Sequence, residues 1–197
     1  MIEIDEQQIQ KALDALEKGG VIVMPTETSY GLGCDATNPA AVARVFEIKG
    51  RPENKGLPVL IVEPSQAEEF VYVSDKAREL MKRYWPGDLN LVLPVREESS
   101  IAVACNEEGA QSVRVSSHPI ASTLVRRFGK PITASSANLS GQEPVFDIAR
   151  VRELFKDQPK QPDFILDGGR LREQPASTIV KIEGDDNEIL RQGRVVL

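Results

Sequence analysis

The chain has 197 residues, of which 41% are hydrophobic and 27% are charged, a composition typical of one folded domain with a substantial apolar core. Its formal net charge of -6 argues against a general affinity for nucleic acid, and we expect neither a membrane span nor an export signal from its short apolar runs and acidic amino end. Two cysteines and one histidine are too few for a thiol-rich metal site, so we expect reduced thiols and a cytoplasmic protein.

The first third of the chain predicts a helix, a buried strand, a second helix and a second strand. Asp5 and Gln8 form a capping box at the start of the first helix. Strands are expected at 21–24 and 57–62, on either side of a helix at 39–48. A strand, a helix and a strand in this order predict a right-handed parallel crossover.

The remaining two thirds predict further helices together with antiparallel strands. Strands at 89–95, 101–105 and 112–116 are joined by turns too short for crossover helices, so we expect antiparallel pairing among them. Other elements are expected as helices at 75–84, 118–128 and 148–155, and as strands at 131–134, 164–166, 177–182 and 188–190. Since we find no internal repeat and no interdomain linker, the pattern predicts a single α/β domain spanning residues 1–197.

Two cations, Lys49 and Arg51, stand at the exposed end of a predicted helix. Alone they fit an ordinary basic helix end, where positive charge favours the helix dipole. Two other segments change that interpretation. Residues 25–37 show no period and are expected to form an irregular loop rich in hydroxyls and glycines, and Ser136 and Asn138 follow a later strand. Together these residues predict a site that binds an anionic substrate through charge and neutral hydrogen bonds.

Several other chemistries are weaker interpretations of the same sequence. Residues 31–36 fit the Gly-x-Gly-x-x-Ala dinucleotide fingerprint, but they lie too far beyond their strand for that fold, and the phosphate loop of P-loop ATPases is absent. Cys34 fits a small buried residue, and His118 fits a surface or capping residue at a helix start. Without a covalent nucleophile or a histidine base, the chemistry should be phosphoryl or nucleotidyl transfer, which depends on positioning and charge.

A set of short motifs runs in order along nearly the whole chain. They are Pro25-Thr-Glu-Thr-Ser-Tyr-Gly-Leu-Gly33, Lys49-Gly-Arg-Pro52, Trp85-Pro-Gly87, Val113-Arg-Val115 with His118-Pro119, Ser136-Ala-Asn-Leu-Ser-Gly141, Ser177-Thr-Ile179 and Arg191-Gln-Gly193. In these motifs the sequence resembles the YrdC-domain family, the threonylcarbamoyl-AMP synthases of tRNA modification. We expect the short, stand-alone form, because nothing follows Leu197 that could be the extra carboxy-terminal domain of longer members.

The resemblance implies an open, twisted α/β sheet of mixed parallel and antiparallel strands, with flanking helices and a deep basic cavity. It implies conversion of L-threonine, bicarbonate and ATP into threonylcarbamoyl-adenylate and pyrophosphate, with Mg2+ on the triphosphate rather than in a protein metal site. Carried over motif by motif, it assigns ATP to Lys49, Arg51, Ser136, Asn138 and Arg191, with Lys49 and Arg51 as the catalytic cations. It assigns threonine or the carbamate to Thr26, Tyr30, Arg114 and Ser177.

Four positions depart from the family pattern. Asp88 stands where proline is usual, Asn90 where threonine is usual, Ser116 where proline is common, and Leu60 where longer members carry a histidine near threonine. These departures concern the detail of the two pockets and leave the implied reaction class unchanged.

Two other functions stay open on the sequence alone. A basic concavity could hold structured RNA through its phosphates and perform no chemistry. A related family member could act on another amino acid or carbamoyl donor. The resemblance also implies that the product passes to a separate threonylcarbamoyl transferase, and it leaves open whether tRNA is bound directly.

Overall fold

The computed structural model describes residues 5–52, 55–184 and 186–197. The α-helices are α1 (Glu6–Glu17), α2 (Pro39–Lys49), α3 (Asp75–Tyr84), α4 (Pro119–Phe128) and α5 (Ile148–Lys156), and two short 3-10 helices are η1 (Pro64–Glu69) and η2 (Val103–Cys105). The strands are β1 (Ile22–Pro25), β2 (Tyr30–Gly33), β3 (Val59–Leu60), β4 (Leu89–Pro94), β5 (Ala110–Arg114), β6 (Ile132–Thr133), β7 (Ser135–Ser136), β8 (Phe164–Ile165), β9 (Thr178–Glu183) and β10 (Asp186–Arg191). In the part of the chain that is described, no helix is both long and apolar enough to cross a bilayer.

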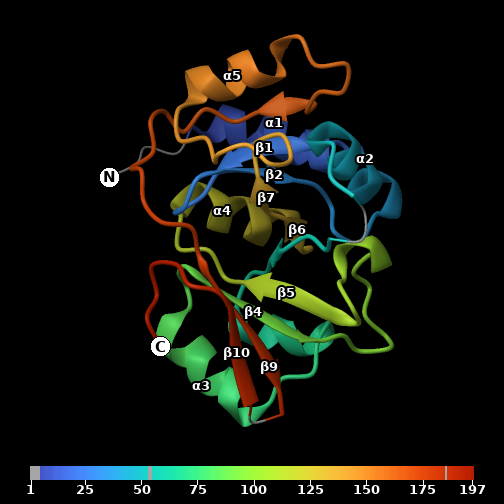
Figure 1. Cartoon of the computed structure of the whole chain (residues 1–197). Helices are drawn as coiled ribbons and strands as arrows, with labels where there is room; N and C mark the ends of the chain where they lie inside the picture. The colour runs from blue at the N-terminus through green and yellow to red at the C-terminus, as the bar shows by residue number, and fades with distance from the viewer. Residues whose placement is uncertain (1–4, 53–54, 185) are drawn as a thin grey trace.

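The strands pair both parallel and antiparallel, which confirms the expected mixed α/β class, and they are divided between two sheets. A four-stranded sheet has the order β7-β2-β1-β8 and lies with α1, α2 and α5 in the upper part of Figure 1. A six-stranded sheet has the order β10-β9-β4-β5-β3-β6, and its strands β4, β5, β9 and β10 lie with α3 in the lower part. The chain therefore offers two sheets between which a cavity can form.

A hairpin of β1 and β2 corrects two predictions from the sequence. Residues 30–33 were expected in an irregular segment, but they form β2 and pair antiparallel with β1, Ile22 opposite Gly33. Short strands rich in glycine lack the alternating apolar pattern that identifies a strand. The predicted parallel crossover from 21–24 to 57–62 is wrong, because β2 and β8 occupy the two edges of β1 while β3 pairs in the other sheet.

The middle of the six-stranded sheet confirms the expected antiparallel pairing in β4 and β5, where Leu91 lies opposite Val113. The prediction of a strand at 101–105 is wrong. This segment contains η2, and the amide of Cys105 donates to the carbonyl of Ala102 at 2.8 Å, as in a tight helical turn. Its apolar residues therefore do not alternate in burial as they would in a strand, and Val103 is 83% exposed.

The helices hold the sheets through buried apolar faces. Asp5 caps α1 as expected by accepting hydrogen bonds from the amides of Gln7 and Gln8. Leu16 of α1 then packs in one apolar cluster with Leu124 of α4, while a larger cluster involves residues of both sheets together with α2 and α3. Each large side chain buried in this way contributes roughly 1.5–3 kcal/mol, so these faces stabilise the frame around the cavity.

Candidate active site

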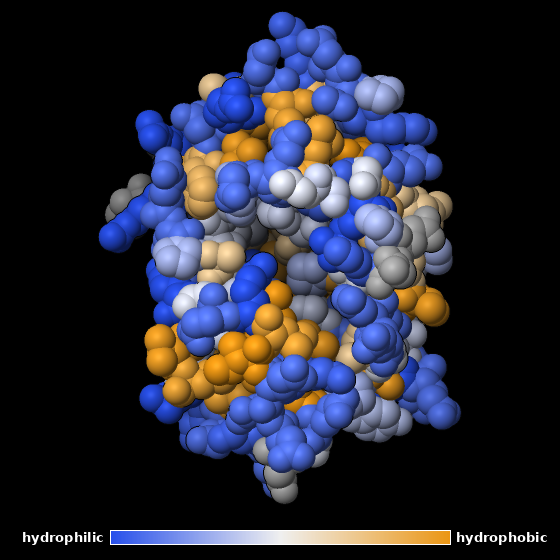
Figure 2. Space-filling model, in the orientation of Figure 1, coloured by the Kyte–Doolittle hydropathy of each residue, from blue (hydrophilic) through white to orange (hydrophobic). Residues whose placement is uncertain are grey.

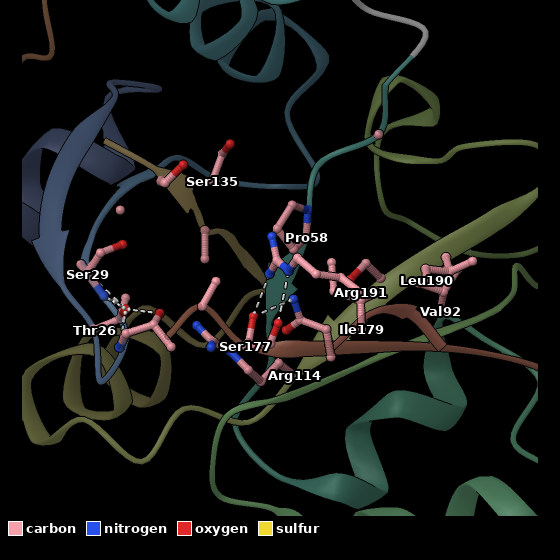
Figure 3. Close-up of a pocket in the computed structure, with 18 of the residues that line it drawn as sticks. Thr26, Ser29, Pro58, Val92, Arg114, Ser135, Ser177, Ile179, Leu190 and Arg191 are labelled. Carbon is pink, nitrogen blue, oxygen red and sulfur yellow. Dashed lines mark hydrogen bonds between the residues drawn. The ribbon is translucent and has the colours of Figure 1, made fainter. Parts of the chain in front are cut away.

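A cavity of about 510 Å³ is lined by residues of both sheets, and Figure 2 shows its mouth as a hollow near the centre of the molecule. Because successive side chains of a strand point to opposite faces, every second residue along β4, β5 and the segment entering β9 reaches the cavity. We call these residues the cavity floor: Asn90, Val92, Ser112, Arg114, Ser177 and Ile179. The cavity roof consists of Thr26, Ser29 and Tyr30 from the β1–β2 hairpin; Figure 3 shows Thr26 and Ser29 across the cavity from Val92.

The hydroxyl groups of Thr26 and Tyr30 in the cavity roof are bound by the protein itself. The Thr26 hydroxyl donates to the carbonyl of Ser29 at 2.7 Å and accepts from the Ser29 amide at 3.3 Å. The Tyr30 hydroxyl donates to the carbonyl of Gly169 at 2.7 Å and accepts from the amide of Gly168 at 3.0 Å. Burial raises the pKa of Tyr30 to about 12, so this hydroxyl stays protonated at neutral pH. These two hydroxyl hydrogens therefore already have acceptors.

Arg114 is a buried cation of the cavity floor, with only 4% of its surface exposed. Its Nη1 lies 3.2 Å from Oε1 of Glu27, and Glu27 also accepts a hydrogen bond from the hydroxyl of Ser116. Nε and Nη1 of Arg114 have no hydrogen-bond partner among the described residues. Glu27 therefore compensates the charge of the guanidinium, whose N–H groups can still bind a substrate carboxylate.

Ser177 lies at the centre of a second polar group, formed with Asn90 and Arg191. Nη2 of Arg191 and Nδ2 of Asn90 both donate to the Ser177 hydroxyl oxygen, at 3.0 and 3.3 Å, and Nε of Arg191 donates to the Ser177 carbonyl at 3.0 Å. Figure 3 shows Arg191 reaching toward Ser177 across these bonds. Burial lowers the pKa of Arg191, but a guanidinium stays charged at neutral pH, so the group presents a fixed positive charge.

The segment after β10 holds Arg191 in this position. Nε of Arg194 lies 2.7 Å from Oδ2 of Asp88, whose side chain is fully buried. Burial raises the pKa of Asp88, and the neighbouring Arg194 acts against that shift. The Thr178 hydroxyl donates to the carbonyl of Val195 at 2.7 Å. The chain is thus fixed on the far side of Arg191 as well as within β10.

Arg51 and Ser136 line the same cavity, close to the ends of α2 and β7. Nε and Nη2 of Arg51 donate to the carbonyls of Lys55 and Gly56, at 3.1 and 2.9 Å, so its own loop orients the guanidinium. Ser136 is held through β7, where it pairs with Gly31 of β2. The structure therefore brings these two expected ATP-binding residues to one cavity with Arg191.

Lys49 and Asn138 do not line the cavity. Lys49 is only 3% exposed, and its ammonium donates to the carbonyls of Ser136 and Asn138, the latter at 2.9 Å. The expectation of an exposed Lys49 is wrong, because the loop at 136–142 covers the end of α2. Burial lowers the pKa of Lys49 to about 8. Nδ2 of Asn138 donates to the carbonyl of Gln142 at 2.6 Å, so both side chains hold the shape of this loop.

The weaker candidates from the sequence occupy structural positions. Cys34 is fully buried, as expected, and burial raises its pKa to about 12, which makes it a poor nucleophile. His118 caps α4, because its Nδ1 accepts from the amide of Ile120, and it is 6% exposed, so it is a capping residue rather than a surface residue. Within the described ranges, no three His, Cys, Asp or Glu side chains are grouped to hold a metal ion.

Seven of the nine predicted site residues line the one cavity: Thr26, Tyr30, Arg51, Arg114, Ser136, Ser177 and Arg191. Several polar residues of this region were not assigned from the sequence, and three of them matter for the site. Asn90 and Ser112 line the floor, and Glu27 pairs with Arg114. Polar residues at alternate positions of otherwise apolar strands were the available signal for Asn90 and Ser112. Glu27 lies inside a motif, but its partner is distant in sequence.

The fold and the cavity together define a class of protein: a mixed α/β protein that encloses a polar cavity with an excess of cationic side chains in its lining. The cavity lining includes four cations, Arg51, Arg114, Lys181 and Arg191, against three carboxylates, Glu107, Glu108 and Glu188. A model of the Sua5/YciO/YrdC family, with the description "Telomere recombination", matches residues 14–193. The chain belongs to this family, which confirms the resemblance seen in the motifs.

Two curated relatives show how the chain compares in length. The threonylcarbamoyl-AMP synthase of Bacillus subtilis (strain 168) is 36% identical over 196 residues, which cover 98% of this chain and 56% of that protein. The threonylcarbamoyl-AMP synthase of Vibrio vulnificus (strain YJ016) is 31% identical over 188 residues, covering 94% of this chain and 98% of that protein. The chain therefore spans little more than half of the first relative and nearly all of the second.

Two solved structures resemble the fold closely. P. abyssi Sua5 complexed with L-threonine matches with a TM-score of 0.89 and 35% identity, over 97% of this chain and 55% of that chain. E. coli YciO matches with a TM-score of 0.86 and 27% identity, over 97% of this chain and 91% of that chain. Both similarities cover nearly the whole of this chain and so include both sheets.

Proposed function

We propose that the protein is an L-threonylcarbamoyladenylate synthase, which joins L-threonine, bicarbonate and ATP into threonylcarbamoyl-adenylate with release of pyrophosphate. Both curated relatives carry the name threonylcarbamoyl-AMP synthase, and the P. abyssi relative was solved with L-threonine. The observation that carries the proposal is one cavity in which the buried Arg114 can meet a carboxylate while Arg51 and Arg191 can meet phosphates.

The reaction requires two bond-forming steps. The neutral amine of threonine and bicarbonate first give the carbamate and water. A carbamate oxygen then attacks the α-phosphorus of ATP, and the bond from that phosphorus to pyrophosphate breaks. Because carbamate and triphosphate are both anions, cations that offset their repulsion lower the barrier. Arg51 and Arg191 are the residues proposed for that task, and Mg2+ enters with ATP as part of the substrate.

The amino acid is assigned to the side of the cavity formed by Arg114 and Ser177. The N–H groups of Arg114 suit the carboxylate, and the Ser177 hydroxyl suits a carboxylate or carbamate oxygen. Thr26 and Tyr30 complete this side from the cavity roof and exclude water from it. Water exclusion matters because both the carbamate and the mixed anhydride are hydrolysed readily.

ATP is assigned to the side formed by Arg51, Ser136 and Arg191. Lys49 and Asn138 serve the same site from behind it, because both fix the loop that carries Ser136. The ammonium of Lys49 also adds positive charge behind that loop. On this assignment Arg51 is a catalytic residue and Lys49 a positioning residue.

The product is an activated anhydride, so a second enzyme must accept it. We propose a separate threonylcarbamoyl transferase that modifies tRNA, in agreement with the synthase names of the relatives. A cytosolic location suits the chain, because both Cys34 and Cys105 are free thiols.

The test is pyrophosphate release from ATP and bicarbonate with single amino acids, followed by mass spectrometry of the product. We expect release to require both threonine and bicarbonate, and the product to have the mass of threonylcarbamoyl-adenylate. Arg51→Ala should lower turnover about 100-fold, as expected for a group that stabilises developing charge, and it should lower the melting temperature only slightly through the two lost hydrogen bonds to the carbonyls of Lys55 and Gly56. Release without threonine, or a preference for another amino acid, would contradict the proposal.

A further inference from the structure

The polar atoms of the cavity divide into those already bound and those without a partner. In the cavity roof, the hydroxyl hydrogens of Thr26 and Tyr30 are donated to the carbonyls of Ser29 and Gly169, each at 2.7 Å. To donate to a substrate, either hydroxyl would have to break an existing bond. A hydroxyl that is occupied in this way contributes shape more than selectivity.

Asn90, in the cavity floor, has the opposite property. It is 5% exposed, and its Nδ2 donates to the Ser177 hydroxyl oxygen at 3.3 Å. Its Oδ1 is buried and has no hydrogen-bond partner among the described residues. A buried acceptor without a donor is costly to the fold, so its presence in a cavity lining needs an explanation. A ligand that donates a hydrogen bond would supply one.

The neighbours of Asn90 indicate which ligand group that is. The antiparallel register that pairs Leu91 with Val113 puts Asn90 opposite Arg114, at a cross-strand Cβ separation of about 4.5–5.5 Å. Nε and Nη1 of Arg114 are themselves without a hydrogen-bond partner. The floor thus sets a neutral acceptor beside a cationic donor. An amino acid with a hydroxyl on the carbon next to Cα offers the matching pair, a donor beside a carboxylate.

We propose that Asn90 selects the amino-acid substrate by accepting a hydrogen bond at Oδ1 from the side-chain hydroxyl, while Arg114 binds the carboxylate. This inference rests on the proposed function, and it names a residue at which the chain departs from the family pattern of threonine. The α-amine of the substrate is a poorer partner for Asn90 than the side-chain hydroxyl. Its lone pair must attack the carbon of bicarbonate, and the resulting carbamate must face the nucleotide.

Ser177 supports this arrangement. Its hydroxyl oxygen accepts from both Asn90 and Arg191, so its own hydrogen is directed elsewhere, toward an acceptor on the substrate. Asn90 therefore acts twice: its Nδ2 fixes the Ser177 hydroxyl, and its Oδ1 reads the substrate hydroxyl. Recognition of this kind rejects an analogue without the hydroxyl, because the buried acceptor is then left unpaired.

The experiment compares threonine with valine, which has a similar shape and no hydroxyl, in the wild type and in Asn90→Leu. Dissociation constants come from calorimetry without ATP, and kcat/KM comes from pyrophosphate release. We expect Asn90→Leu to weaken threonine binding roughly 10-fold or more and to change valine binding by less than a factor of two. The preference for threonine over valine should therefore be lost. The KM for ATP should stay constant.

Asn90→Thr is the matched variant, since it returns a hydroxyl acceptor and should recover much of the preference. Asn90→Ala, which also lacks a side-chain acceptor, replaces Asn90→Leu should the leucine variant fail to fold. Three outcomes would overturn the role of Asn90: equal weakening of threonine and valine binding in the leucine variant, an unchanged preference for threonine over valine in that variant, or no such preference in the wild type. Wild-type protein that binds threonine in preference to valine but releases no pyrophosphate would instead overturn the proposed function, and the dissociation constants would still decide the role of Asn90.

Discussion

The cavity roof and the cavity floor face each other, yet they differ in how their polar atoms are used. In the roof, the hydroxyls of Thr26 and Tyr30 already donate to the backbone carbonyls of Ser29 and Gly169. The floor keeps Asn90 and Arg114 with buried atoms that lack hydrogen-bond partners among the described residues. Asn90 and Arg114 lie in neighbouring strands whose register fixes the spacing of their side chains, so the unpaired atoms stand where their geometry is well controlled. We therefore infer that the roof sets the shape of the cavity and that the floor sets its selectivity.

The largest effect should come from the floor, in Arg114→Leu. Threonine affinity should fall more than about 100-fold, because the carboxylate loses its charged partner. Stability should also fall by about 3–5 kcal/mol, since Glu27 is left buried without its cation. Calorimetry and urea denaturation measure the two effects.

A double variant separates those two effects. Adding Glu27→Gln to Arg114→Leu removes the stranded charge, so stability should recover in large part while threonine binding stays lost. Recovery of threonine binding in the double variant would mean that Glu27, rather than the loss of Arg114, had weakened it.

A smaller effect should come from Lys49, which supports the Ser136 loop beside the roof. The pKa of Lys49 is about 8 in the folded chain against an ordinary value of 10.5, because burial disfavours the ammonium. Between these pH values the unfolded chain holds a proton that the folded chain has released, so the free energy of unfolding rises with pH. We expect the stability of the wild type relative to Lys49→Met to rise from pH 8 to pH 10 and to be constant below pH 8.

Urea denaturation of the two proteins at matched pH values provides that measurement. The comparison cancels the titration of all other groups, which both proteins share. A difference that stays constant from pH 8 to pH 10 would show that the two carbonyl acceptors keep the ammonium charged in the folded chain.

The smallest effect should come from the roof, in Tyr30→Phe. The variant loses the donation to Gly169 and leaves the amide of Gly168 without its acceptor, which should cost about 1–2 kcal/mol of stability. The preference for threonine over valine should stay the same, because the hydroxyl is already occupied. Thermal melting tests the loss of stability, and competitive pyrophosphate release with threonine and valine tests the preference. If Tyr30→Phe lost the preference for threonine, the Tyr30 hydroxyl in the roof would be a selectivity determinant.

Much of the frame could be predicted from local sequence signals. The cap at Asp5 and the period of the apolar residues locate α1, and similar signals locate the other helices. The strand β2 could not be found in this way, because Gly31 and Gly33 give no alternating pattern. Its pairing with β1 also decides that β3 belongs to the other sheet, so one missed strand produced the wrong crossover.

The site could be predicted only in part, for a related reason. Motifs identify which side chains matter, but burial depends on segments that are distant in sequence. Lys49 looks like an exposed helix end until the carbonyls of Ser136 and Asn138 reach it. Arg114 pairs with Glu27, and Asn90 pairs with Ser177. In both pairs the partner likewise comes from another part of the chain. No local pattern reports such pairings.

The parallel pairing of β9 with β4 has a consequence for the order in which the site assembles. Leu89 pairs with Thr178, far along the chain, so the floor is complete only after the last strands have docked. Contacts of such high sequence separation form slowly in folding, and every residue of the neighbouring strand β10 is exposed, so little burial opposes its local opening. Ser177 and Arg191 would then leave the cavity while the β1–β2 hairpin stays folded. Bound substrate should therefore slow amide hydrogen exchange most in β9 and β10.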